Sequence, residues 1–298
     1  EKRVRRILKT PIHTPYKNGE GGVKIGLSPI PNSEWLEIDD LFFSEIQIKK
    51  NLFNTKHNEV YLDTPESVDS QKETLNSIME NLELYHPAHL NKIKANQKYH
   101  PNLTPLETAA LLVQEDLIIM MPRNEEYFLS AASLCSPSNW SLNNKFNKSL
   151  LDLHEHVPSY KSSIGDKVNH LFTKLPENKI FQRFNWSIYE SPDLFQPAKN
   201  KKVIKRSKSI NERNAGDKLF VRVERQTIKR LTLTKSIVFT VRIHVTPLYQ
   251  LKQDILLLTS LKKGIKNISL PLKRYKSLDE IEKPLIQWLD HSINTFKC

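Results

Sequence analysis

Cysteine is scarce in this sequence: the chain has 298 residues and only two cysteines, Cys135 and Cys298. Two thiols so far apart make no disulfide framework, and they cannot complete a structural zinc site. An iron–sulfur cluster needs more thiolates, so none is expected on this chain. Low cysteine usage is typical of a reducing compartment, and we therefore expect a cytoplasmic protein.

Long apolar runs and glycine-rich loops are also missing. No run approaches the roughly 18 apolar residues that cross a bilayer, and no long apolar stretch follows the basic residues 1–6, so we expect no membrane partner. No glycine-rich loop follows a predicted strand, which argues against a flavin or nicotinamide site on this chain. Hydrophobic residues make up 38% of the sequence, enough to predict a packed core rather than disorder.

What the sequence has in excess is positive charge, with a formal net charge of +12. Such a balance is typical of nucleic-acid-binding proteins and of proteins that dock acidic partners. The most basic segment, residues 199–213, contains no aromatic side chain that could stack on bases, so we expect no nucleic acid. The run 199–208 remains either a docking site for an acidic electron-delivering protein or a solvated loop.

Hydrophobic periodicity predicts helices near the start of the chain and strands in its middle. Helices are expected at 41–53, 67–84 and 105–114, the last with Thr104 as its cap and Pro105 at its first position. Residues 116–121 and 127–134 read as a hairpin, and 141–154 and 164–175 read as helices. The remaining expected elements are strands at 180–190, 219–228 and 236–245 and helices at 249–260 and 278–294.

This order predicts an α+β protein with a PAS-like antiparallel sheet, whose helices lie between the second and third core strands. We assign residues 1–112 to an N-terminal arm and helices, 113–247 to the core with a basic loop at 198–217, and 248–298 to C-terminal helices. We expect these three regions to form one structural unit.

Two patterns place polar side chains where chemistry is possible. His154 follows Leu142, Phe146 and Leu150 at four-residue spacing, so on a helix it would share an apolar stripe. A neutral imidazole there is either an iron ligand or a core histidine with satisfied hydrogen bonds. Alternation in 219–228 puts Arg222, Glu224 and Gln226 on one strand face, which is either a pocket wall or an exposed face with a weak salt bridge.

Several segments together resemble one family. They are GLSPIPNSEWLEID (26–39), QEDLIIM (114–120), YFLSAASLCSPSNWSLNNKFNKSLLDLHEHVP (127–158), RFNWSI (183–188), RVERQTIKRL (222–231) and IVFTVR (237–242). In this order and spacing they resemble the heme-dependent oxidative N-demethylase family, which includes the heme subunit of dimethylamine monooxygenase. The resemblance runs from near the start of the chain to its last strand pair.

The resemblance implies a PAS-like core that holds one heme b. It implies a monooxygenase that uses dioxygen to demethylate a small N-methyl amine such as dimethylamine, giving formaldehyde and the shorter amine. Electrons would come from a separate reductase subunit of flavin and iron–sulfur type. A heme-based gas sensor and a heme-free structural relative are the alternatives.

The resemblance also assigns residues. His154, at the family's I-H-x-P-V-P position, is the expected axial ligand of the heme iron, with His156 as the fallback and Cys135 as a weaker option. Glu224 would orient the cationic amine. Arg222 is grouped with Glu224 at the catalytic face and could instead hold a heme propionate.

Arg183 and Arg230 are further expected partners of the heme propionates. Two departures from the family pattern concern the same region. Asn147 replaces the glycine of a K-x-G motif, and because asparagine tolerates left-handed backbone we expect the turn to be kept. Ser136 replaces the aromatic residue of a C-F-P-S motif, which would change substrate preference if this position lines the pocket.

Overall fold

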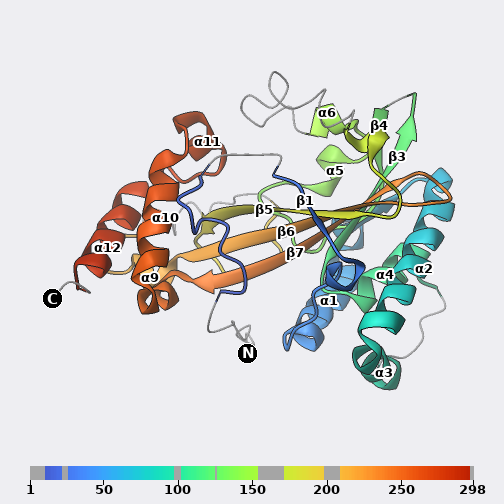
Figure 1. Cartoon of the computed structure of the whole chain (residues 1–298), viewed down its shortest axis with the longest axis horizontal. Helices are drawn as coiled ribbons and strands as arrows, with labels where there is room; N and C mark the ends of the chain where they lie inside the picture. Colours follow the sequence, from blue (N-terminus) through green and yellow to red (C-terminus); the bar gives the residue numbers. More distant parts are fainter. Residues whose placement is uncertain are drawn as a thin grey trace.

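A seven-stranded antiparallel sheet in the order β1-β5-β6-β7-β3-β4-β2 forms the centre of the protein (Figure 1). The computed structural model describes residues 11–21, 26–96, 102–124, 126–153, 171–197 and 209–295. The strands are β1 (Ser28–Ile30), β2 (Tyr61–Asp63), β3 (Asp116–Arg123), β4 (Glu126–Ser133), β5 (Ile180–Tyr189), β6 (Phe220–Arg230) and β7 (Ile237–Pro247).

Most of the helices lie in two groups at opposite ends of the sheet. The helices are α1 (Phe42–Val60), α2 (Val68–Tyr85), α3 (Pro87–Asn96), α4 (Pro105–Leu112), α5 (Leu142–Lys145), α6 (Leu150–Leu153), α9 (Ala215–Lys218), α10 (Ile255–Asn267), α11 (Leu270–Tyr275) and α12 (Glu282–Thr295). Figure 1 shows α1 to α4 at one end of the sheet and α9 to α12 at the other, with α5 and α6 on the opposite face from α1 to α4. No helix within the described ranges has both the length and the apolar character of a membrane span.

The α+β class and the core strand order are confirmed. β3 and β4 form the expected hairpin, and β5, β6 and β7 follow as an antiparallel meander whose last strand pairs with β3. Thr104 makes a capping box with Glu107 at the start of α4, as its sequence predicted. α2 ends at Tyr85, before His86 and Pro87, also as expected.

The predicted helix 141–154 is wrong as one continuous element. Asn147 has a φ of 58°, which ends α5 and turns the chain toward β4. The Asn147 amide donates to the Leu129 carbonyl at 2.9 Å, and Ser149 forms an isolated bridge with Phe128 before α6 begins. Asparagine therefore adopts the left-handed turn predicted from the family's glycine, and the four-residue stripe does not lie on one helix.

Other boundaries also differ from the sequence predictions. Residues 248–253 form a 3-10 helix, and Asp254 then starts α10 by accepting the amides of Leu256 and Leu257. The predicted helix at 278–294 begins later, at Glu282. His154, His156, most of the predicted helix 164–175 and the basic run 199–208 lie outside the described residues.

Candidate functional site

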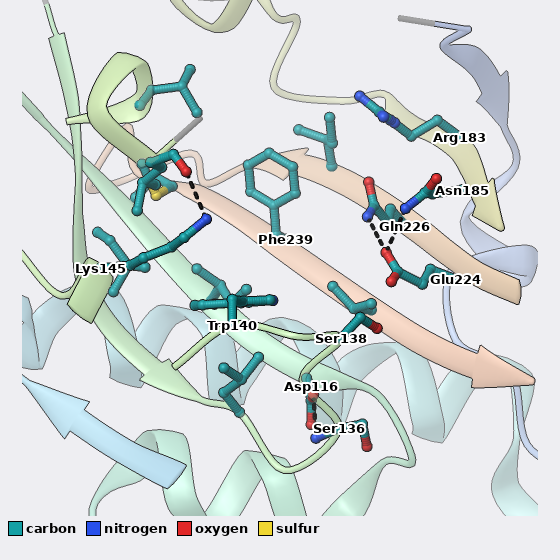
Figure 2. A pocket seen from close by; sticks show the side chains of 18 of the residues that line it. Asp116, Ser136, Ser138, Trp140, Lys145, Arg183, Asn185, Glu224, Gln226 and Phe239 are labelled. Atoms are coloured by element: carbon teal, nitrogen blue, oxygen red, sulfur yellow. Dashed lines mark hydrogen bonds between the residues drawn. The ribbon is translucent and has the colours of Figure 1, made fainter. Parts of the chain in front are cut away.

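A cavity of about 280 Å³ lies on the sheet face beside α5 and α6 (Figure 2). Its walls come from β3, β4, β5, β6 and β7, and from the segments around residues 134–153, 171–172 and 275–276. Most of the wall is apolar: it includes Leu27, Ile118, Met120, Leu129, Leu134, Trp140, Leu150, Leu153, Leu171, Phe172, Ile228, Phe239 and Val241. A partly open, largely apolar cavity of this kind, with a few charged groups, is the usual form of a cofactor or substrate site.

The charged groups of the cavity lie in separate regions of its wall. Figure 2 shows Arg183, Asn185, Glu224 and Gln226 together at one side, while Lys145 lies across the cavity. We call the first region the polar end. Lys145 donates its ammonium proton to the Leu153 carbonyl at 2.7 Å, so it holds α5 and α6 together as well as lining the cavity.

Glu224 is held by its neighbours at the polar end. Gln226 Nε2 donates to Glu224 Oε2 at 2.9 Å, and Asn185 Nδ2 donates to the same oxygen at 3.4 Å. Strand alternation places Glu224 and Gln226 on the cavity face of β6, and the β5 register puts Asn185 opposite Glu224. Within the described ranges, the other oxygen, Oε1, accepts no hydrogen bond, so it can accept one from a ligand.

Lys276 completes the polar end and was missed by the sequence analysis. This lysine follows α11, and its Nζ donates to Asn185 Oδ1 at 2.8 Å and to the Trp186 carbonyl at 2.5 Å. Burial of the ammonium lowers the Lys276 pKa to about 8, against the attraction of Glu224, and Arg183 lowers it further. No local pattern could have found it, because its partners are distant in sequence.

Asp116 is a buried carboxyl at the base of the cavity. It accepts the amides of Cys135 and Ser136 at 2.8 and 2.7 Å and so fixes the chain after β4. Burial raises its pKa to about 6, although Lys49 and these two amides act in the opposite direction. Ser136 itself lines the cavity, so the position where the family pattern has an aromatic residue faces this space.

Arg222 lies on the same face of β6 but outside the cavity lining. Its guanidinium donates to the carbonyls of Ser136, Pro137, Asp193 and Leu194 and to the Ser138 hydroxyl, at 2.9 to 3.3 Å. These contacts tie two loops to the strand. Arg222 therefore stabilises two loops next to the cavity without lining it.

Arg183, Arg230 and Cys135, which the sequence also suggested, lie in three different environments. Arg183 lines the cavity at its polar end. Arg230 lies at the end of β6 and donates to the Thr173 carbonyl at 2.7 Å. Burial raises the pKa of the Cys135 thiol to about 12, which disfavours the thiolate that would bind iron. Leu153 and Leu171, which precede and follow residues 154–170 in the sequence, both line the cavity.

A partly open, largely apolar cavity with a charged end, built on an antiparallel sheet, defines an α+β protein whose cavity is suited to an apolar ligand bearing polar groups. Residues 26–286 match the family model described as "Haem-dependent oxidative N-demethylase, alpha subunit-like". The match covers most of the chain, and the chain belongs to this family. Membership indicates a heme-dependent oxidoreductase of the N-demethylating kind, and a subunit related to the alpha subunits of such enzymes.

The cavity fits the chemistry of a heme. A heme presents a flat apolar macrocycle and two carboxylates, and the lining offers apolar side chains together with Arg183, Lys276 and Lys145. Cations near an apolar pocket are suitable partners for propionates. The donor set and the apolar walls are thus compatible with the cofactor that the family description names.

Proposed function

We propose that this chain is the heme-binding subunit of a monooxygenase that removes a methyl group from a small N-methyl amine. The observation that carries the proposal is the cavity, in which a long apolar wall ends at the Glu224 carboxylate. Heme in this pocket would supply oxidation of the N-methyl carbon by dioxygen. A separate reductase subunit of flavin and iron–sulfur type would provide the electrons, because this chain offers no thiolate set for a cluster.

In this proposal His154 is the axial ligand of the heme iron and Arg183 is a partner of a propionate. The position of Leu153 in the cavity wall supports the first assignment, since His154 is the next residue along the chain. The placement of Arg183 in the lining supports the second. Arg230 is a less direct partner, because its described hydrogen bond goes to a backbone carbonyl.

Glu224 would orient the amine. An alkylammonium can donate a hydrogen bond to Glu224 Oε1 while Gln226 and Asn185 keep the carboxylate in place through Oε2. The apolar walls exclude water around the methyl group, which favours one fixed orientation of the substrate. Breaking the bond between nitrogen and the oxidised methyl carbon would release that carbon as formaldehyde and leave the shorter amine.

Ser136 bears on substrate size. Its position lines the cavity, and a serine occupies less volume there than the aromatic residue of the family pattern. We therefore propose that this protein accepts an amine with a larger substituent than dimethylamine.

The first test is an absorption spectrum of the protein purified from heme-supplemented cells, before and after dithionite and carbon monoxide. We expect a Soret band corresponding to about one heme per chain that shifts with carbon monoxide, because a ligand-accessible iron face is needed for oxygen chemistry. Formaldehyde release from a panel of N-methyl amines then tests turnover with a reductant. Stable heme with no turnover would favour a sensor, and a folded protein without a Soret band would favour a heme-free relative.

The axial ligand is tested by His154→Ala, with His156→Ala as the matched control. We expect His154→Ala to lose stoichiometric heme, because the iron loses its protein ligand. His156→Ala should keep the wild-type Soret band. Retention of heme with an unchanged band in His154→Ala would remove this residue from the ligand role.

A further inference from the structure

The polar end of the cavity places the Lys276 ammonium near the Glu224 carboxylate, and Arg183 lines the same region. An incoming alkylammonium that binds Glu224 would therefore meet the like charge of Lys276 beside its carboxylate partner. Like-charge contacts in a partly enclosed site are unfavourable, so a simple dialkylammonium is an incomplete match for this end.

Lys276 is fixed in place as a donor. Its ammonium is held by Asn185 Oδ1 and by the Trp186 carbonyl, and it lies 5.9 Å from the centroid of the Trp186 ring. No carboxylate within the described ranges is recorded within ion-pair distance of this ammonium. An ammonium has three hydrogens, and the two recorded bonds leave the third for a ligand in the cavity.

The hydrogen bonds of Asn185 connect the Lys276 ammonium to the Glu224 carboxylate. Asn185 accepts from Lys276 through Oδ1 and donates to Glu224 through Nδ2, so one amide fixes both groups. A ligand that carries an anionic and a cationic group a few atoms apart would satisfy both at once. The cost of holding an ammonium in a partly buried site is then offset when an anion binds.

We propose that Lys276 forms a carboxylate-binding subsite at the polar end of the cavity, in the part of the lining that also contains Arg183. Two sources can supply the carboxylate: a heme propionate, or the carboxylate of an N-methylated amino acid whose ammonium binds Glu224. The assignment of a heme propionate, and the role of an N-methylated amino acid as substrate, both rest on the proposed function. Binding of a carboxylate to the subsite does not require that function to be correct.

The test uses Lys276→Met, which keeps a side chain of similar length and removes the charge. Lys266→Met is the matched control, because Lys266 is exposed on α10 and does not line the cavity. Lys276→Arg restores a cation. Circular dichroism and the unfolding midpoint establish that each variant is folded before any binding is measured.

One arm of the experiment examines the propionate. Hemin and its dimethyl ester, which lacks free carboxylates, are titrated into heme-free protein. If a propionate occupies the subsite, Lys276→Met weakens hemin binding by at least about tenfold, the value of one charge-assisted hydrogen bond, and leaves ester binding unchanged. Lys266→Met and Lys276→Arg stay near the wild type.

The other arm examines the substrate. N-methylglycine and dimethylamine are titrated into the heme-loaded protein and, by calorimetry, into the heme-free protein. If an amino acid occupies the subsite, Lys276→Met weakens N-methylglycine binding by about tenfold or more while hemin affinity is unchanged. Binding of N-methylglycine in a protein that takes up no heme would support the subsite and reject the proposed function.

The pH dependence of carboxylate binding tests whether the charge of Lys276, and not only its shape, is needed. Glu224 and Arg183 are the charged groups that act on Lys276, and the hydroxyl of Tyr275 lies in the same wall. Carboxylate binding should weaken as the pH rises through about 8, where Lys276 loses its proton, and Lys276→Arg should remove this dependence. A Lys276→Met variant that binds hemin and N-methylglycine as tightly as the wild type would overturn the proposal.

Discussion

Polar side chains on one face of β6 divide between supporting the fold and facing the cavity. Arg222 is buried and bonded to loop carbonyls, whereas Glu224 and Gln226 line the cavity two and four residues later. Strand alternation was enough to predict that these three residues share a face. It could not separate their roles, because the loops at 136–138 and 193–194 reach Arg222 only in the folded chain.

This difference predicts opposite effects of two substitutions. Arg222→Met should lower the free energy of unfolding by about 3 kcal/mol, since several buried carbonyls lose their donor. Glu224→Gln should change the free energy of unfolding little, keep the heme content and lower formaldehyde release by about tenfold or more. Urea unfolding, the Soret absorbance and an amine turnover assay measure the three quantities.

Arg213→Met is the control for lost charge, because Arg213 is exposed and does not line the cavity. It should leave both stability and turnover unchanged. Equal turnover in Glu224→Gln and the wild type would contradict the role proposed for this carboxylate. An unchanged unfolding midpoint in Arg222→Met would contradict its supporting role.

At the scale of elements, the helices and strands with clear periodicity or capping residues were predictable. α2, α4 and the hairpin of β3 and β4 were found in this way. The segment 141–154 was not, because its four-residue spacing fits a helix while Asn147 turns the backbone. The competing hydrogen bonds come from Leu129 on β4, and no local pattern reveals them.

The turn at Asn147 gives a prediction about backbone strain. Asn147→Ala should lower the free energy of unfolding by about 1 kcal/mol more than Asn147→Gly, because alanine disfavours a φ of 58° and glycine does not. Both variants lose the hydrogen bond that Asn147 Oδ1 accepts from Arg123, so their difference isolates the backbone. Chemical unfolding of the two proteins measures it.

Asn144→Ala, on the exposed side of α5, should be close to neutral. If the alanine and glycine variants at position 147 were equally stable, the left-handed turn would not be a source of strain. A loss of heme in Asn147→Ala would further indicate that this turn positions the chain leading to His154.

At the scale of the whole molecule, strands from the N-terminal region belong to the central sheet. β1 pairs with β5, and β2 pairs with β4, so strands of the predicted first region complete the sheet of the predicted core. The two pairs join the predicted first region to the core, and the union of all three regions in one structural unit stays a prediction. The arm also carries His13, whose Nε2 lies 2.6 Å from Glu37, while His244 of β7 lies 2.8 Å from the other oxygen of that carboxylate.

These buried ionisable groups predict how stability depends on pH. Burial lowers the pKa of His244, although Glu37 raises it, so the folded state binds the proton less well than the unfolded chain. The pKa of Glu37 lies well below its usual range, because hydrogen bonds from His13 and His244 outweigh the effect of burial. Because both pKa values are lower in the folded state than in the unfolded chain, the free energy of unfolding decreases as the pH falls. The loss begins below about 6.5 for His244 and below about 4.5 for Glu37.

Urea midpoints at pH 7.5 and pH 5.5 test this dependence. The wild type should be less stable at the lower pH, and His244→Gln should show a smaller difference between the two values. His291→Gln, on the exposed side of α12, should keep the wild-type difference. A His244→Gln protein with an unchanged dependence would place the acid-sensitive group elsewhere.

The arm at residues 11–21 also bears on how the protein is made. Tyr16 is fully buried against Trp186, the Glu20 carbonyl accepts from the Trp186 indole, and the Gly19 carbonyl accepts from Asn267 of α10. The arm is translated before α10, which follows it by about 240 residues, and at ordinary rates of synthesis this separation is on the order of 10–50 s. During that interval the α10 part of the arm's binding surface does not yet exist, so the arm can dock fully only after α10 has been made.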